Sequence, residues 1–98
     1  MDRLDLIRIF VRVVESGSFS ATARERGVRQ PAISKHVAAL EARLGAELIR
    51  RSSRTFSVTD AGRDFYESSV RLLEDFDAAT AQAKRAVASF RRETPAFW

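Results

Sequence analysis

The apolar residues of this chain recur at two different spacings, and the change of spacing divides the chain into its elements. Steps of three and four residues are typical of amphipathic helices. They run through residues 3–15, 30–44 and 60–92. Between the last two stretches the pattern changes to alternation, as in Phe56-Ser57-Val58, which favours a half-buried strand. The pattern predicts a mainly helical protein with one small β-hairpin.

The first helix is predicted from about Arg3 to Glu15, with Asp2 as its N-cap and Gly17 in a left-handed position after its end. Its expected buried stripe consists of Leu4, Ile7, either Phe10 or Val11, and Val14.

A second, short helix is predicted from Phe19 to Arg26, capped by Ser18 and closed by Gly27. Its small residues Ala21, Thr22 and Ala23 suit close packing against another helix.

The third helix opens at Gln30-Pro31, where a proline loses no helical hydrogen bond, and ends at Gly45. Its apolar stripe, expected to be core, is Ile33, Val37, Leu40 and Leu44. Gln30, Ser34 and Lys35 fan out from the edge of that stripe to its far side, so they cannot all be core. Gln can pair with adenine and Lys with guanine in a major groove, while Pro31 and Ala32 can touch a thymine methyl group.

Two short strands are predicted at 48–51 and 56–58, with Arg50, Arg51 and Arg54 around the tip between them. Arginine suits a narrow, electronegative minor groove. Arg54 is the better candidate for such a contact, because Arg51 could instead brace the hairpin in an ion pair with Glu47 or Asp60. Two short helices joined by a Gly-containing turn and followed by a basic hairpin are the layout of a winged helix-turn-helix, which binds double-stranded DNA.

The fourth helix is predicted from Asp60 to about Arg92, after Thr59 as N-cap. At 1.5 Å per residue it is about 50 Å long, too long for a head of residues 1–59 to cover. Its apolar residues follow the spacing of a coiled-coil seam, which favours a homodimer over folding back onto the head. The expected seam is Leu73, Phe76, Thr80, Ala83, Val87 and Phe90, flanked by Leu72 and Ala79. Residues 93–98 form a tail.

The net charge of +4 is confined to one part of the chain. Residues 1–60 hold 11 basic and 7 acidic residues, whereas residues 61–98 hold 6 of each. A localised excess of this kind is the footprint expected for a polyanion partner.

Composition excludes several other classes of protein. The chain has no cysteine, which fits a reducing cytoplasm, and its apolar runs are far too short for a membrane span. His36 is the only histidine, so a catalytic or metal-binding role lacks partners; it is expected near a phosphate or base, or in solvent. No nucleophile–base pair or phosphate-binding loop suggests an enzyme, and no cofactor is expected. RNA binding would need exposed aromatic residues, and a protein-binding winged helix would not need the basic excess.

The ordered motifs resemble the N-terminal DNA-binding domain of LysR-type transcriptional regulators over roughly residues 3–90. The motifs that carry the resemblance are Phe10 with Val13-Val14-Glu15, Gly17-Ser18-Phe19-Ser20-Ala21-Thr22-Ala23, Gln30-Pro31-Ala32-Ile33-Ser34, Leu40-Glu41 with Leu44-Gly45, Leu48 with Arg51, and Val58-Thr59-Asp60-Ala61-Gly62. The resemblance implies a bacterial, cytoplasmic, nucleoid-associated regulator that binds a partly palindromic operator as a dimer. It also implies Gln30, Pro31, Ser34 and Lys35 in the major groove, Ser20 near a phosphate, and the wing arginines near the minor groove.

Three positions depart from the family pattern. Arg29 replaces the usual Ser or Thr and removes the side-chain cap of the third helix, although Arg29 could gain a phosphate contact. Arg26 stands where an apolar residue usually packs, and Ser53 where Gly is common. The family's effector-sensing domain is also missing, so we expect an excised fragment rather than a naturally short protein, without an inducer site.

Overall fold

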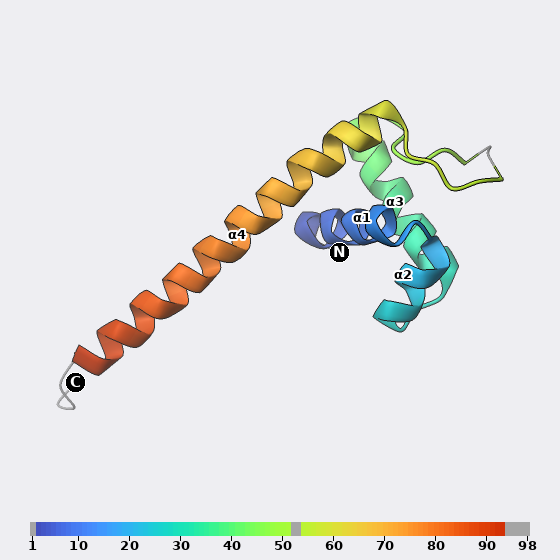
Figure 1. Cartoon of the computed structure of the whole chain (residues 1–98). Coiled ribbons are helices and arrows are strands. Elements are labelled where there is room, and N and C mark those ends of the chain that lie inside the picture. The colour runs from blue at the N-terminus through green and yellow to red at the C-terminus, as the bar shows by residue number, and fades with distance from the viewer. Residues whose placement is uncertain (1, 52–53, 94–98) are drawn as a thin grey trace.

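A computed structural model describes residues 2–51 and 54–93 of the chain. The described part is an elongated molecule of 64 × 27 × 21 Å, in which a small helical head carries one long projecting helix (Figure 1). Its helices are α1 (Arg3–Ser16), α2 (Phe19–Arg26), α3 (Gln30–Leu44) and α4 (Asp60–Glu93). All four helices agree with the prediction to within about one residue at each end.

Local capping explains most of these boundaries. Gly17, Gly27 and Gly45 end α1, α2 and α3 in the left-handed region, at φ of 69°, 68° and 68°, a conformation that other residues adopt at a cost. The Ser18 hydroxyl accepts a hydrogen bond from the Ala21 N–H at 3.1 Å, which confirms Ser18 as the cap of α2.

The caps of the other helices differ from each other. The Thr59 hydroxyl accepts from the Gly62 N–H at 2.9 Å and so caps α4 as predicted. Asp2 occupies the N-cap position of α1 as predicted, but its side chain makes no cap bond. Arg29 also makes no side-chain cap bond, which agrees with the expected loss at the start of α3.

Helix α1 is the centre of the head, because it packs against α2, α3 and α4. Leu6, Ile9, Phe10 and Val13 are 0–3% exposed and form its most buried face. The predicted stripe was right at Phe10 and Val11 and displaced elsewhere, because a helix with neighbours on several sides buries most of its circumference, and apolar periodicity alone cannot select one face. The residues predicted instead are half-buried at its edges, while Phe10 and Val11 are both buried. These edge residues are Leu4, Ile7 and Val14.

The stripe of α3 is confirmed except at its last member. Ile33, Val37 and Leu40 are buried in the core, whereas Leu44 is 44% exposed. Leu44 lies in the last turn of α3, beside the start of α1, and lines an open groove there with Phe65 of α4.

The wing between α3 and α4 is smaller than the two predicted strands. Within residues 48–51 and 54–59, its pairing is one antiparallel bridge between Ile49 and Val58, which includes a bond from Arg50 N–H to Ser57 O at 3.0 Å. The N–H groups of Leu48 and Ile49 instead donate to the Glu41 carboxylate, which removes them from the ladder. Ser53, which stands where the family commonly has Gly, falls outside the described residues.

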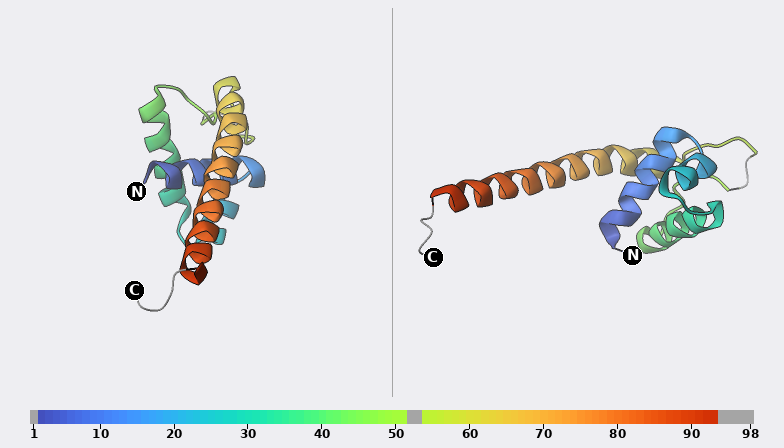
Figure 2. Two further views of the ribbon diagram at one scale, coloured as in Figure 1. Left: turned by 90° about the vertical axis from the view of Figure 1, so that its left-hand side faces the viewer. Right: turned by 90° about the horizontal axis from the view of Figure 1, so that it is seen from below.

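The first half of α4 packs on α1, and its second half projects beyond the head as one continuous helix (Figures 1 and 2). Ser69 and Leu73 are 1% and 8% exposed in this contact, so Leu73 belongs to the head core and its assignment to a dimer seam was wrong. No helix in the described ranges is long and apolar enough to cross a membrane.

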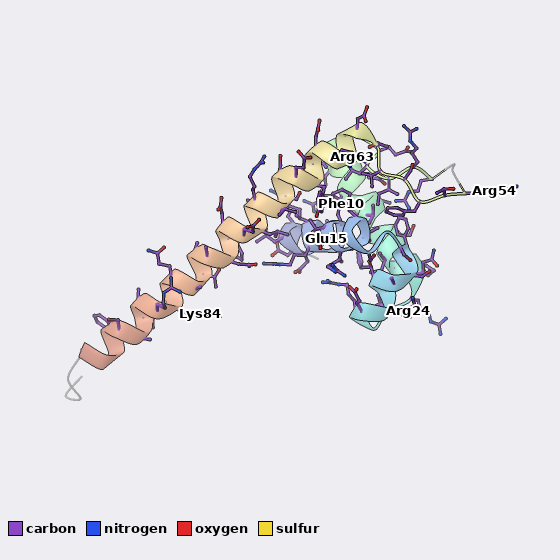
Figure 3. All side chains as sticks on the ribbon, in the orientation of Figure 1. Phe10, Glu15, Arg24, Arg54, Arg63 and Lys84 are labelled. Atoms are coloured by element: carbon purple, nitrogen blue, oxygen red, sulfur yellow. The ribbon has the colours of Figure 1, made fainter. Side chains whose placement is uncertain are left out.

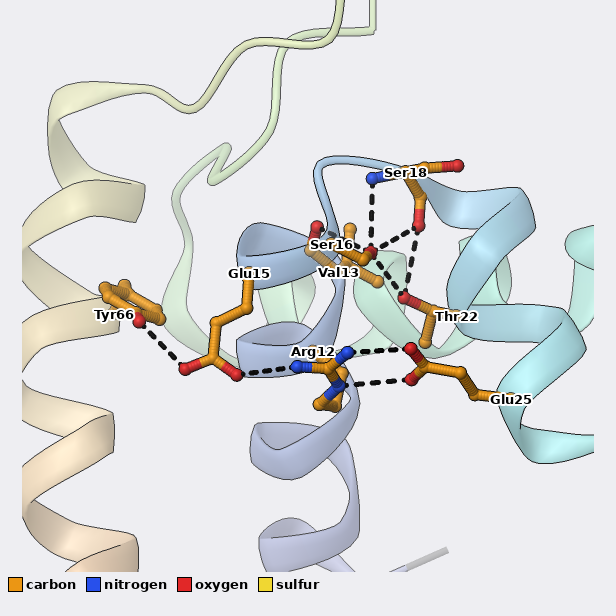
Figure 4. A network of polar contacts seen from close by, with 8 residues as sticks. All are labelled: Arg12, Val13, Glu15, Ser16, Ser18, Thr22, Glu25 and Tyr66. Carbon is orange, nitrogen blue, oxygen red and sulfur yellow. Dashed lines mark hydrogen bonds and ion pairs between the residues drawn. The ribbon is translucent and has the colours of Figure 1, made fainter.

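A chain of polar contacts links α4 through α1 to α2 (Figure 4). The Tyr66 hydroxyl donates to Glu15 at 2.9 Å, and Arg12 contacts both Glu15 and Glu25, at 2.9 and 2.7 Å. The hydrogen bond from Arg12 lowers the pKa of Glu25, and the hydrogen bond to Glu15 raises the pKa of Tyr66. These solvent-exposed contacts orient the helices and add little stability individually.

Candidate nucleic-acid interface

The first turn of α3 is exposed and is held next to α2 by a polar contact. The Ser20 hydroxyl of α2 donates to the side-chain oxygen of Gln30 at 2.9 Å. This bond leaves the amide N–H₂ of Gln30 as the free donating end of the side chain. Two of the predicted residues, ten positions apart, therefore lie together and restrict each other's orientation.

The base of the wing is joined to the middle of α3 by Arg51. One terminal nitrogen of its guanidinium donates to the Ser34 hydroxyl at 3.0 Å, and the other to Glu41 at 3.0 Å. The guanidinium carbon also lies 5.1 Å from the centre of the Phe19 ring, at the range of a cation–π contact. Arg51 thus binds α2, α3 and the wing together.

These residues surround one cleft of about 400 Å³ between the start of α2, the N-terminal half of α3 and the wing. Five of the ten residues predicted for DNA line it: Ser20, Gln30, Ser34, Arg51 and Arg54. Figure 3 shows Arg54 at the far end of the wing, well away from the helical body. The lining of the cleft therefore combines hydrogen-bonding side chains with arginines.

The other five predicted residues lie outside this cleft, at the start of α3. Arg29, Pro31 and Lys35 are exposed, whereas Ala32 and His36 are half-buried. Their positions give α3 a second polar and basic flank beside the cleft.

The expected ion-pair partners of Arg51 were wrong. Arg51 pairs with Glu41, whereas the sequence suggested Glu47 or Asp60. Glu41 lies two helical turns after Ser34, so both present their side chains on one face of α3, which the wing covers.

Sequence reasoning missed two residues that shape this site. In the sequence, Glu41 and Phe19 stand out only as members of family motifs, and Phe19 also as the start of a helix. Phe19 contacts both Arg51 and the Phe56 ring, the latter at 6.2 Å between centroids. An acidic residue in an otherwise basic recognition segment was the available signal for Glu41, whereas Phe19 gave none.

The predicted seam on α4 remains largely on the surface. Leu72, Phe76, Val87 and Phe90 are 43–62% exposed. Ala79 and Ala83 are also exposed, and the half-buried Thr80 donates its hydroxyl to the Phe76 carbonyl at 2.9 Å, as expected for a polar residue on an apolar stripe. Phe76 lies at the border with the head, where the Arg8 guanidinium is 6.0 Å from its ring centre.

Comparisons with known proteins agree with this architecture. The profile of the family described as "Bacterial regulatory helix-turn-helix protein, lysR family" matches residues 4–63. A probable hydrogen peroxide-inducible genes activator of Mycobacterium leprae is 48% identical over 77 residues, which cover 79% of this chain and 25% of that protein. The AaeR transcriptional activator of Escherichia coli is 40% identical over 75 residues, 76% of this chain and 24% of that protein. The chain thus spans about a quarter of the length of these relatives.

Solved structures of lysR-type regulators have a similar fold. The DNA-binding domain of BenM, in a crystal structure with catB site 1 DNA, superposes with a TM-score of 0.85 at 33% identity, covering 96% of this chain and 100% of that one. DarR of Vibrio fischeri, in complex with DNA, reaches a TM-score of 0.82 at 27% identity, covering 90% of this chain and 30% of that one. The chain belongs to the lysR family of bacterial regulatory helix-turn-helix proteins and forms a DNA-binding domain of that family.

Proposed function

We propose that the head binds operator DNA with the N-terminal half of α3 in the major groove and the wing at the adjacent minor groove. The observation that carries the proposal is the common cleft: Gln30 and Ser34 lie on the same surface as Arg51 and Arg54. The first pair can read base edges, and the second pair suits a narrow groove of high negative potential. The BenM and DarR structures, which contain DNA, support this use of the fold.

Within this proposal the remaining predicted residues divide by their position. Lys35, Pro31 and Ala32 follow Gln30 on the exposed start of α3 and are assigned to base edges. Ser20, Arg29 and His36 flank them and are assigned to phosphates, which set the register of the protein without reading sequence. The function is binding without a catalytic step, in a regulator that works in the bacterial cytoplasm on nucleoid DNA.

We also assign the exposed half of α4 to a homodimer contact. The seam continues where α4 has left the head, with Ala83, Val87 and Phe90. We propose that these residues pack against α4 of a second chain. A dimer holds two heads at a fixed spacing, which suits an operator with two half-sites about one turn apart. We propose a longer regulator that responds to an effector because this chain is similar to lysR-family relatives.

A selection from random duplexes, followed by a base-substitution scan, tests the division of roles. Gln30→Ala and Lys35→Ala are expected to lose discrimination at defined base pairs, by about 1–3 kcal/mol each. Arg54→Ala is expected to weaken binding without changing those preferences, while the preference for flanking A/T pairs relaxes. If Arg54→Ala shifts the preferred bases and Gln30→Ala does not, the helix and wing roles are reversed.

Salt dependence tests the electrostatic part. A dimer with roughly 6–10 phosphate contacts loses about 10³–10⁵ in affinity between about 50 and 200 mM salt, because bound counterions are released on binding. A salt-independent affinity contradicts the proposal.

A further inference from the structure

Glu41 occupies an unusual place for an acidic residue, on the wing side of a helix proposed to bind DNA. Its side chain is only 14% exposed. One carboxylate oxygen accepts the N–H groups of Leu48 and Ile49, at 2.7 and 3.2 Å. The other oxygen accepts the Arg51 guanidinium at 3.0 Å. A single carboxylate therefore makes three contacts to the first segment of the wing.

Arg51 connects Glu41 to the proposed recognition surface of α3. Its second terminal nitrogen donates to Ser34, seven residues before Glu41 on α3. The guanidinium is a planar fork whose donors are fixed relative to each other, so bonds to Glu41 and Ser34 define the position of Arg51 along α3. Arg54 follows three residues later, at the end of the wing (Figure 3).

Little backbone pairing holds Arg54 among the described residues of the wing. These residues are paired through one bridge, Ile49 to Val58, which consists of two backbone bonds, Arg50 N–H to Ser57 O and Thr59 N–H to Leu48 O. A two-stranded hairpin of this size is marginal by itself. Its direction relative to α3 therefore depends on the attachments at its base.

We propose that Glu41 is a positioning residue for DNA recognition: through Arg51 it sets the spacing between the wing and the N-terminal half of α3. The inference rests on the proposed function for its role in binding. With the spacing set, the base-reading residues of α3 and Arg54 engage two grooves at once. Without Glu41, the wing samples several directions relative to α3. Fixing one direction then costs part of the free energy of DNA binding.

The proposal and simple electrostatics predict opposite changes in DNA affinity when the negative charge of Glu41 is removed. Glu41→Gln and Glu47→Gln each remove one negative charge from the basic head, and charge alone predicts tighter DNA binding for both. Glu47 is the matched control, because its side chain is exposed and the Thr59 hydroxyl donates to its backbone carbonyl rather than to its carboxylate. Glutamine at position 41 keeps an oxygen for the Leu48 and Ile49 N–H groups and loses the ion pair.

We expect Glu47→Gln to bind a selected duplex as tightly as the wild type or more tightly. Glu41→Gln is expected to bind about tenfold more weakly, equivalent to about 1.4 kcal/mol. It should also lose the preference for flanking A/T pairs while keeping the base preferences of α3. Arg51→Lys, which preserves the positive charge and removes the fork, should behave like Glu41→Gln. Tighter binding by Glu41→Gln, or a loss of the α3 preferences instead, overturns the proposal.

A second readout does not depend on DNA. The chain has no cysteine, so Ala38→Cys on α3 and Thr55→Cys on the wing allow two spin labels to be placed. Their distance distribution, measured without DNA by electron spin resonance, should broaden in Glu41→Gln and Arg51→Lys and stay narrow in Glu47→Gln. Circular dichroism verifies that each variant is folded.

The two readouts separate the two proposals. If the wild type binds no DNA, the proposed function fails, and the label distances still test whether Glu41 holds the wing. If the label distances are the same in all variants, Glu41 does not position the wing, whatever the protein binds.

Discussion

The two halves of α4 carry the same apolar spacing but have different surroundings. In the first half, Leu73 and Ser69 are buried against α1, and Asp77 makes the last ion pair with the head, to Arg8 at 2.8 Å. In the second half, Val87 and Phe90 are 51% and 62% exposed. The comparison teaches that a continuous apolar stripe can serve two partners in succession, first its own head and then, as we propose, a second copy of the chain.

The largest expected effect in this comparison is on the half of α4 that packs on the head. Leu73→Ala removes a buried side chain and is expected to lower the free energy of unfolding by about 2–5 kcal/mol. Chemical denaturation at several protein concentrations measures it, and the loss should persist at concentrations where the protein is monomeric. If stability is lost only at concentrations where the protein is dimeric, Leu73 contributes to the dimer seam instead of the head core.

The second effect concerns the projecting half. Val87→Asp places a charge where we propose an apolar helix contact, and an unpaired charge is costly to bury. We expect the dimer dissociation constant to rise at least about hundredfold, or about 2.7 kcal/mol, with the head still folded. Sedimentation measures the change. Ala78→Asp is the control, because Ala78 lies on the opposite side of α4 and is exposed. Equal dissociation by both variants, or none by Val87→Asp, contradicts the seam.

The third effect is the loss of stability when a side chain is added at the contact between the start of α4 and the wing. A Cβ added at Gly62 would overlap the Leu48 carbonyl oxygen and lie 2.7 Å from Cγ1 of Val58. Gly62→Ala is therefore expected to destabilise the head by about 1–3 kcal/mol, although alanine favours helices elsewhere. Thermal unfolding measures it against Ser68→Ala, an exposed α4 position that should change stability by less than about 0.5 kcal/mol. A neutral Gly62→Ala would mean that α4 can shift away from the wing.

The smallest effect is the pH dependence of the last head contact of α4. The hydrogen bond from Arg8 lowers the pKa of Asp77 below its ordinary value of 3.8. A carboxyl whose pKa is lower in the folded state stabilises the fold above about pH 3.8, and this contribution is lost as the pH falls through the folded value. The stability difference between wild type and Asp77→Asn should therefore shrink in acid. Asp75→Asn, which removes the same charge from an exposed position on α4, is the control.

Helix boundaries were predictable because they depend on near neighbours. Gly17, Gly27 and Gly45 adopt the left-handed conformation within one turn of the helix that each ends, and Ser18 and Thr59 cap within three residues. Such signals are written in consecutive residues and need no tertiary contact. Part of the candidate site was predictable for the same reason: Gln30 and Ser34, which line the cleft, follow from helical spacing.

The contacts among these elements were not predictable to the same degree. Arg51 had three acidic candidates within about ten residues in either direction, and the nearest one in sequence was not its partner. The choice of Glu41 required the wing to fold back along α3, which brings together groups that local spacing does not relate. Phe19 illustrates the same point, since its contact with Arg51 joins α2 to the wing.

The sequence by itself determined the order and length of the helices, the position of the turns, the basic head and the kinship to the lysR family. Only the tertiary structure decided which face of α1 is buried, that Leu73 belongs to the head, and that Glu41 holds the wing. The physical reason is the range of the interactions involved. Caps and periodicity act over one or two turns, whereas burial and ion pairing depend on which surfaces the whole chain brings together.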